Sequence, residues 1–365
     1  MKKRIVIKLG SAVVMRENGS IASDRLCELV HVCKRLRESG AEILIVSSGA
    51  VGLGKQELGL QGAQSLINKQ AAAAVGQSIL MEHYRKLFGA VGISCAQVLL
   101  THHDFSSRQR YLSLQKVFQR LLELGAIPVI NENDTVSSAE LVEVGQSKSF
   151  GDNDRLSALV ASKLACDQLV LLSNVDAVYD DNPHTNPLAC RIPEIDDFTV
   201  LSTIHTAGTS DAGRGGMQSK LEAARIAAMS GVSTIIASGL IPGVMEQIFF
   251  GDEQCGTLIR SCRRMAERKH WIGLAAGSAG SLTINRGAEL ALLQNNASLL
   301  PVGIIGINGK FEARQTVGIL SEDQQEIGRG IVNYSSAELS QQLGRHSPKE
   351  AIVRENMVLY QGAKQ

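Results

Sequence analysis

Aromatic residues are scarce in this 365-residue chain, at 4% of the total, and there is a single tryptophan. The hydrophobic core must therefore be built mainly from Val, Ile, Leu and Ala, as in buried parallel sheets. An excess of charge of either sign is also absent, because 37 Lys and Arg residues face 36 Asp and Glu residues. A formal net charge of +1 creates no global field that would favour nucleic acid or an anionic membrane as a partner.

The chain also lacks paired cysteines and long apolar runs. Its seven cysteines are odd in number and include no Cys-x-x-Cys pair, which argues against a disulfide framework or a zinc site and for a reducing compartment. Apolar runs fall well short of the roughly 20 residues that cross a bilayer. Lys8 interrupts the N-terminal apolar stretch, so that stretch cannot form the core of a signal peptide. We therefore expect a cytoplasmic protein with no membrane contact.

Short apolar runs alternate with longer helical patterns through the first two thirds of the chain. This alternation predicts crossover connections and an α/β fold with a mostly parallel open sheet sandwiched by helices. The expected strands cover residues 5–7, 43–46, 98–100, 127–130, 169–172 and 234–237. The expected helices cover residues 24–39, 70–88, 107–124, 152–165 and 217–230.

The composition of the sequence changes beyond Gly256, where a cluster of basic residues extends to Trp271. We interpret the cluster as the solvated face of a linker, and we place a first domain at 1–260, the linker at 261–275 and a small second domain at 276–365. The second domain has short alternating segments at 281–284, 303–307, 316–320 and 327–332, which predicts a β-rich unit.

Three glycine turns coincide with predicted strand ends or helix starts. The segment from Gly49 to Lys55 has the glycine and lysine spacing of a P-loop, but Gln56 stands where the Mg²⁺-binding Ser or Thr would be. A tight turn without a ligand is one interpretation; an anion-binding turn is favoured because Ser48 and Gly49 follow a buried strand. The turns at 8–11 and 213–217 carry Lys8 and Lys220, and together the three indicate phosphate handling.

Acidic and amide residues cluster in two segments, 131–135 and 151–154. Helix capping would require only one such residue in each segment, and here there are seven across the two. The first cluster directly follows a predicted strand, and ligands of open α/β sheets bind outside the carboxyl ends of the strands. We therefore expect a polar ligand site there.

With these motifs the chain resembles the amino-acid kinase family, and within it the branch that phosphorylates the γ-carboxylate of glutamate and carries a C-terminal PUA domain. The resemblance runs essentially end to end. It is carried by the segments 7–11 (Ile-Lys-Leu-Gly-Ser), 48–50 (Ser-Gly-Ala), 69–77 (Lys-Gln-Ala-Ala-Ala-Ala-Val-Gly-Gln), 131–134 (Asn-Glu-Asn-Asp), 151–154 (Gly-Asp-Asn-Asp), 215–217 (Gly-Gly-Met) with Lys220, and 298–301 (Ser-Leu-Leu-Pro).

The resemblance implies an amino-acid kinase fold followed by a small β-rich PUA domain. It implies that Lys8 and Lys220 flank the phosphoryl group in transfer and that Asp154 holds the two lysines in place. Ser48, Asp134 and Asn153 would bind glutamate, with Asp134 facing the α-amino group. The implied nucleotide-binding residues are Lys8, Ser173, Asn174, Arg214, Gly215, Gly216, Met217, Gln218, Ser219 and Lys220.

ATP is the implied phosphoryl donor, with Mg²⁺ held mainly through the nucleotide phosphates and by no dedicated protein ligands. The resemblance further implies the first step of proline biosynthesis, feedback inhibition by proline, a homodimer or homotetramer, and a glutamyl phosphate reductase as a possible partner. Three features depart from the family pattern: Ser173 and Asn174 replace Thr and Asp, Arg214 replaces Thr, and the stretch 141–150 is longer than usual.

The chemistry of this reaction needs no general base, because a γ-carboxylate with a pKa of about 4.3 is ionised at neutral pH. What it needs is neutralisation of charge between two anions, which lysines, backbone N–H groups and Mg²⁺ supply. Two alternatives remain. One is a degenerate kinase fold with a regulatory or RNA-binding role, which the eight basic and eight acidic residues of 276–365 disfavour. The other is a kinase for a different acyl or nucleotide acceptor.

Overall fold

A computed structural model describes residues 2–62, 65–101, 104–105, 108–136, 153–183, 185–196, 216–251, 255–261, 279–295, 297–344 and 349–359. The chain divides into two compact units, Met1–Arg264 and Met265–Gln365. The expected linker at 261–275 lies almost entirely outside the described residues, so the boundaries at 260 and 276 stay predictions. In the described part of the chain, no helix has the length and apolar character needed to cross a membrane.

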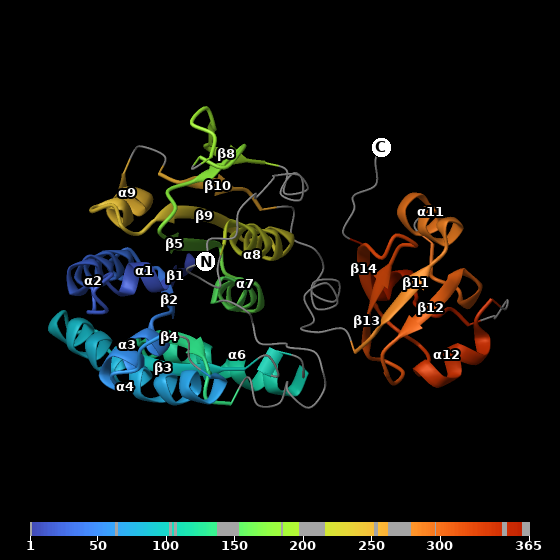
Figure 1. Ribbon diagram of the computed structural model, residues 1–365, viewed down its shortest axis with the longest axis horizontal. Helices are drawn as coiled ribbons and strands as arrows, with labels where there is room; N and C mark the ends of the chain where they lie inside the picture. The colour runs from blue at the N-terminus through green and yellow to red at the C-terminus, as the bar shows by residue number, and fades with distance from the viewer. Residues whose placement is uncertain are drawn as a thin grey trace. The chain divides into compact units, whose positions relative to one another are not determined.

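The first unit is built around an eight-stranded sheet of order β3-β4-β2-β1-β5-β9-β10-β8 (Figure 1). Every pairing is parallel except that of β9 with β10, which confirms the predicted mostly parallel open sheet. The strands are β1 (Arg4–Leu9), β2 (Glu42–Ser47), β3 (Cys95–Leu100), β4 (Ile127–Glu132), β5 (Gln168–Ser173), β8 (Glu194–Ile195), β9 (Ser233–Ser238) and β10 (Thr257–Ile259). A separate two-stranded ribbon pairs β6 (Val178–Tyr179) with β7 (Arg191–Ile192).

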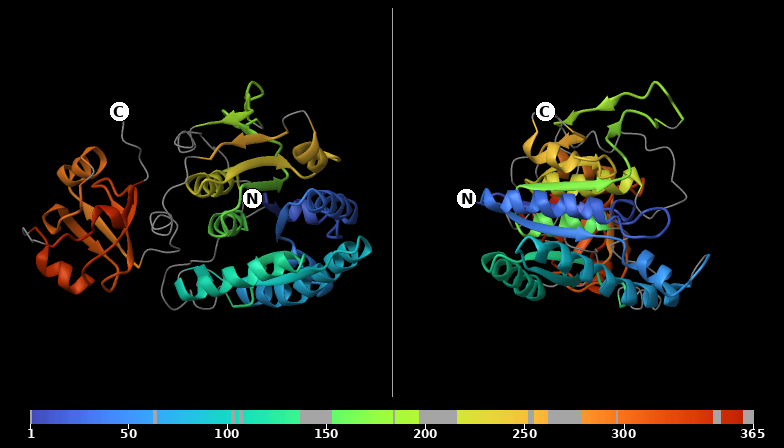
Figure 2. Two further views of the ribbon diagram at one scale, coloured as in Figure 1. Left: turned by 180° about the vertical axis from the view of Figure 1, so that it is seen from behind. Right: turned by 90° about the vertical axis from the view of Figure 1, so that its left-hand side faces the viewer.

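Helices cover both faces of this sheet (Figures 1 and 2). On one face lie α6, α7 and α8, with α7 crossing β1, β2, β4 and β5. On the other face lie α2, α4 and α9, which contribute side chains to one hydrophobic cluster with the central strands. The helices are α1 (Ser11–Val14), α2 (Ser23–Glu38), α3 (Ala50–Glu57), α4 (Leu66–Ala90), α6 (Arg108–Glu123), α7 (Asn153–Lys163), α8 (Met217–Met229) and α9 (Val244–Phe250). Helix α4 begins four residues before the expected residue 70, because the side chain of Ser65 accepts a hydrogen bond from Asn68 N.

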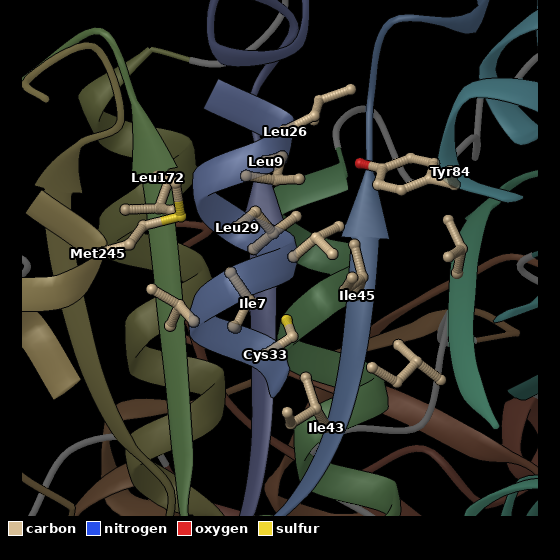
Figure 3. Close-up of a cluster of buried hydrophobic side chains, with 14 of the residues drawn as sticks. Ile7, Leu9, Leu26, Leu29, Cys33, Ile43, Ile45, Tyr84, Leu172 and Met245 are labelled. Atoms are coloured by element: carbon tan, nitrogen blue, oxygen red, sulfur yellow. The ribbon is translucent and has the colours of Figure 1, made fainter. Parts of the chain in front are cut away.

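The core of the first unit lies between α2 and the central strands (Figure 3). Alternate residues of β1 point to opposite faces of the sheet, so Ile7 and Leu9 pack under α2 against Leu29 and Cys33. Lys8, between Ile7 and Leu9, therefore points to the other face, which α7 covers. This alternation places a lysine beneath α7 while the apolar neighbours of that lysine anchor the strand.

The second unit has a five-stranded sheet of order β12-β11-β13-β14-β15 and a hydrophobic cluster of its own. This confirms the predicted β-rich C-terminal domain. Its elements are β11 (Ser281–Ile284), α11 (Arg286–Gln294), η3 (Pro301–Gly303), β12 (Ile304–Asn308), β13 (Thr316–Leu320), β14 (Glu326–Ile331), α12 (Ser336–Gln342), η4 (Arg354–Asn356) and β15 (Met357–Leu359).

The glycine-rich segment after β2 folds differently from the expected loop. Gly49, with φ of +109°, forms the N-cap of α3, and Gly52 and Gly54 lie inside that helix. A Cβ atom at Gly54 would overlap the carbonyl oxygen of Ala72 on α4. Close helix packing therefore explains this glycine, and the P-loop spacing of the segment is coincidental.

The same contact requires a glycine on α4. A Cβ at Gly76 would overlap the carbonyl oxygen of Ala50, whereas one at Gly89, on the same helix, would meet nothing within 4 Å. We expect Gly76→Ala to lower the free energy of unfolding by about 3 kcal/mol, because the two helix backbones must separate. Gly89→Ala should be neutral or stabilise by up to about 1 kcal/mol through helix propensity. Urea unfolding of the two variants measures the contrast, and equal effects would refute the packing role.

Lys163, at the end of α7, is 5% exposed and packs in an apolar pocket between α6 and α7. Its ammonium lies 5.3 Å from the centre of the Tyr111 ring, and the Tyr111 hydroxyl donates to the Lys163 carbonyl at 2.7 Å. Burial lowers the pKa of Lys163 to about 8, because the charged form is poorly solvated there. An unfolded lysine keeps its proton to about pH 10.4, so between these two values the unfolded chain binds more protons and stability rises with pH.

Replacing Lys163 with methionine removes this buried charge and keeps most of the apolar stem. We expect Lys163→Met to be more stable than the wild type at pH 7, by up to about 3 kcal/mol, and the difference to shrink as pH rises above 8. Lys34→Met, at an exposed site, serves as the control and should show no such trend. Unfolding measured at several pH values tests this, and a pH-independent difference would contradict the buried charge.

Candidate active site

The predicted catalytic and glutamate-binding residues come from elements that meet at the carboxyl ends of the central strands. Residue pairing aligns Leu9 of β1 with Ser47 of β2 and with Leu172 of β5, and Ile130 of β4 with Val46 of β2. The chain continues from β1 to β2 on one side, while β5 flanks β1 on the other. The direction in which successive strands are added to the sheet therefore reverses beside β1. Open α/β sheets bind ligands outside the carboxyl ends of the strands at such a point.

A buried cluster of three charges lies at this edge. Lys8 Nζ is 2.5 Å from Asp154 Oδ1, and Lys220 Nζ is 3.2 Å from Asp154 Oδ2. The lysine side chains are 4% exposed and the aspartate is fully buried. The structure thus brings together the three residues predicted to be catalytic, from β1, α7 and α8.

Local sequence explains how each charge reaches the cluster. Lys8 is the inward residue of β1 on the α7 face, and Asp154 stands in the first turn of α7, where a carboxylate is favoured by the helix dipole. Lys220 lies near the start of α8, where the positive end of the helix dipole disfavours a lysine. The Asp154 carboxylate supplies its negative partner, so a bound polyphosphate is not required to account for this lysine.

The three side chains of the cluster, two lysines and one aspartate, have a formal net charge of +1 among themselves and are all buried. Burying an excess charge is costly unless an ion of opposite sign compensates it. Because Asp154 engages each lysine through a different oxygen, the two ammonium groups lie on either side of one carboxylate. The arrangement is suited to an anion such as a phosphoryl group.

Next to the charge cluster lies a network of amides. Asn153 Nδ2 is 2.9 Å from Ser48 Oγ, 2.9 Å from Asn131 Oδ1 and 3.3 Å from the carbonyl oxygen of Ser47. The network joins α7 to the ends of β2 and β4. Two of the predicted glutamate-binding residues, Ser48 and Asn153, are therefore in direct contact, and Asn153 is the chain neighbour of Asp154.

Two further members of the network are Asn131, which belongs to the segment 131–135 predicted to form a polar ligand site but was assigned no role, and Gln77, which was not among the predicted site residues. Asn131 Nδ2 donates to Gln77 Oε1 at 2.9 Å, and both side chains are buried. The sequence does contain a signal for Gln77, which shares the buried face of α4 with Ala73, Leu80 and Tyr84. A glutamine on an apolar helix face is unusual and invites a search for its partner.

Part of the predicted anion turn is already occupied by protein groups. Ser48 N donates to the carbonyl oxygen of Leu9 at 3.0 Å, so this N–H is not available to an anion. Beneath it, the Tyr84 hydroxyl donates to Ser47 Oγ at 2.9 Å and points toward the tip of β2 (Figure 3). Burial raises the pKa of Tyr84, so the hydroxyl keeps its proton as a structural donor.

The predicted nucleotide residues fall into three groups. Ser173 is buried at the end of β5, where its Oγ accepts a hydrogen bond from Val175 N at 3.3 Å, and Asn174 is exposed beside it. Gly216 is the N-cap of α8, and the first turn of that helix contains Met217, Gln218 and Ser219. Arg214, Gly215 and the long stretch 141–150 lie outside the described residues.

Asp134 lies in the turn after β4 and is half-buried. It follows Asn131, a member of the amide network, by three residues in the sequence. Among the described residues, no group of three His, Cys, Asp or Glu side chains could hold a metal ion.

Comparison with known families agrees with this geometry. The sequence pattern of the amino acid kinase family matches residues 3–238, and that of the PUA domain matches residues 280–350. The chain therefore belongs to the amino acid kinase family and carries a PUA domain after its kinase domain.

Within that family its relatives are glutamate 5-kinases. The glutamate 5-kinase of Thermus thermophilus is 42% identical over 353 residues, which cover 96% of this chain and 93% of that protein. The glutamate 5-kinase of Gloeobacter violaceus is 42% identical over 371 residues, covering 97% and 98%. A carbamate kinase from Giardia lamblia, solved with AMP-PNP bound, shares the fold, with a TM-score of 0.52 and 17% identity over 72% of this chain and 99% of that chain.

Breaking the charge cluster gives a test of its electrostatics. We expect Asp154→Asn to lower the free energy of unfolding by about 3 kcal/mol, because two buried ammonium groups lose their shared counter-ion. ATP should then raise the melting temperature of the variant more than that of the wild type, since the added anion meets a larger excess of positive charge.

The matched control for this experiment is Glu42→Gln. It breaks the 2.6 Å ion pair of Glu42 with Arg4 at the opposite, amino-terminal edge of the sheet. This variant should lose stability without gaining sensitivity to ATP. Equal shifts with ATP in both variants, measured by thermal denaturation, would show that the cluster is no anion site.

Proposed function

We propose that this protein transfers the γ-phosphoryl group of ATP to the γ-carboxylate of L-glutamate, giving L-glutamyl 5-phosphate. The observation that carries the proposal is the buried Lys8–Asp154–Lys220 cluster, which adjoins the amide network of Asn153 at one edge of the sheet. The near full-length similarity of the chain to glutamate 5-kinases supports the choice of glutamate over other acceptors. This reaction is the first step of proline biosynthesis.

The lysines act on the phosphoryl group in transfer. A carboxylate oxygen of glutamate attacks the γ-phosphorus, a new O–P bond forms, and the bond from phosphorus to the bridging oxygen breaks to release ADP. Negative charge then lies on the attacking oxygen, the transferred group and the leaving group together. Lys8 and Lys220 can divide this charge between them, and Asp154 holds their ammonium groups so that no reorganisation is needed during transfer.

Glutamate binds beside the cluster through Ser48, Asn153 and Asp134. The Asp134 carboxylate is suited to the α-ammonium group of an amino acid, which a nucleotide acceptor lacks. Asn153 and Asp154 are consecutive residues, so the acceptor site and the charge cluster share the N-terminal turn of α7. This common support would align the nucleophile with the phosphoryl group, which contributes to the rate of phosphoryl transfer together with charge stabilisation.

The nucleotide site of the proposal comprises Ser173, Asn174 and residues 214–220. Mg²⁺ bound to the ATP phosphates would neutralise part of their charge. We further propose feedback inhibition by proline, assembly as a homodimer or homotetramer, a cytoplasmic location, and a reductase as the consumer of the acyl phosphate. These proposals rest on the family and on the chemistry of a product that hydrolyses readily.

The direct test is release of ADP from MgATP by the purified protein, with hydroxylamine present to trap an acyl phosphate. We expect ADP and hydroxamate to appear together with glutamate and not with N-acetylglutamate, aspartate or UMP. Turnover with UMP, or ADP release without hydroxamate, would defeat the proposal. Absence of turnover with every acceptor would instead favour a regulatory or RNA-linked role.

Two variants separate binding from transfer. Asp134→Ala should raise the KM for glutamate at least roughly tenfold with little change in the KM for ATP, because it removes a partner of the amino acid alone. Lys220→Ala should lower kcat by roughly a thousandfold, because it removes charge stabilisation in the transition state. Steady-state kinetics in both substrates measures the contrast. A lower kcat in Asp134→Ala together with a higher KM for glutamate in Lys220→Ala would contradict both assignments.

A further inference from the structure

We propose that Gln77 is a positioning residue that fixes the orientation of the Asn131 and Asn153 amides and thereby sets the hydrogen-bonding pattern offered to the amino-acid substrate. The inference rests on the proposed function, since it concerns recognition of glutamate. Gln77 lies on α4, buried behind the network. It acts through Asn131 and is not itself a catalytic residue.

Two groups hold the Asn131 amide in one orientation, the backbone of β4 at its oxygen and Gln77 at its nitrogen. Glu132 N donates to Asn131 Oδ1 at 2.9 Å, and a backbone N–H can only donate. The oxygen of the Asn131 amide must therefore face Glu132 N, and its nitrogen must face the other way. In that direction lies Gln77, whose Oε1 accepts from Asn131 Nδ2 at 2.9 Å.

Burying the Gln77 side chain costs free energy of folding. Its Nε2 is buried and has no hydrogen-bond partner among the described residues. A buried N–H without a partner is unfavourable, and a leucine or methionine would be favoured at this position of an apolar helix face. The acceptor oxygen of Gln77 offsets this cost only if the orientation of Asn131 matters. No other described residue accepts a hydrogen bond from Asn131 Nδ2.

The consequence is transmitted to the substrate side through Asn153. Asn131 Oδ1, fixed as an acceptor, meets Asn153 Nδ2 at 2.9 Å, and the carbonyl oxygen of Ser47 and the hydroxyl of Ser48 surround the same nitrogen. Because three acceptors face Asn153 Nδ2, Asn153 Oδ1 is turned away from them and is left to accept from a ligand. The Ser48 hydroxyl already accepts from Asn153, so its own proton is left to donate.

An acceptor beside a donor matches an amino acid, which carries an ammonium group and carboxylates. The opposite amide orientation would present an NH₂ group to the ammonium and would repel it. Without the Gln77 acceptor, Asn131 Nδ2 becomes a buried donor with no partner. This unfavourable state promotes rotation of the Asn131 side chain. Asn153 then loses one of the acceptors that fix its orientation.

The test compares Gln77→Met, which keeps the shape and removes the acceptor, with Gln77→Glu, which keeps an acceptor oxygen. We expect Gln77→Met to raise the KM for glutamate roughly tenfold and to leave the KM for ATP unchanged. Gln77→Glu should stay within roughly threefold of the wild type for both substrates. Because KM does not depend on the folded fraction of a preparation, the comparison tolerates partial unfolding, and Gln77→Ala offers a second variant without the acceptor.

Gln168→Met is the matched control, because Gln168 lies at the amino-terminal start of β5, away from the site, and also has a buried amide atom without a partner. It should leave both KM values unchanged. The effect of Gln77→Met should also disappear when Asn131 is already replaced by alanine. Parallel rises in both KM values, an unchanged KM for glutamate, or additivity with Asn131→Ala would overturn the inference. A wild type without glutamate-dependent turnover would instead refute the proposed function.

Discussion

The site depends on a single buried carboxylate. Asp154, fully buried in the first turn of α7, pairs with Lys8 of β1 and with Lys220 of α8. Without it, two ammonium groups would lie in a poorly solvated place with no shared counter-ion. With it, the cluster keeps a net positive charge that an anion can compensate, and three elements that are distant in the sequence are fixed relative to one another. The packing of the sheet against α7 and α8 therefore determines the position of the charge cluster at which we propose that phosphoryl transfer takes place.

Two consecutive residues at the start of α7 belong to different parts of the site. Asn153 belongs to the amide network and Asp154 to the charge cluster, so neighbouring residues connect the proposed acceptor site to the proposed phosphoryl site. Behind them the apolar side chains of β1 pack in the core between α2 and the central strands (Figure 3). The polar site is thus built on elements whose other faces are fully buried.

Much of this arrangement could be predicted from the sequence, because strand and helix periodicity are local properties. The positions of Lys8, Ser48 and Asp134 at or near strand ends, and of Asp154 at a helix start, could be predicted in this way, whereas their roles came from the resemblance to the amino-acid kinase family. The glycines of α3 could not be predicted in the same way, since Gly54 is required by a contact with Ala72, a residue far along the chain. Gln77 was missed for the same reason: its significance appears only when α4 is placed against the end of β4. The pairing of Lys220 with Asp154 was implied by the family resemblance alone, because it depends on how α8 packs against α7.

A crystal structure with MgADP, aluminium fluoride and glutamate would test the account most directly, because the planar fluoride complex mimics the phosphoryl group in transfer. The account predicts that this group lies between Lys8 Nζ and Lys220 Nζ, with a glutamate γ-carboxylate oxygen in line with it and Asp154 still in contact with both lysines. A fluoride complex bound away from the two lysines, or a glutamate that leaves Asn153 untouched, would contradict it.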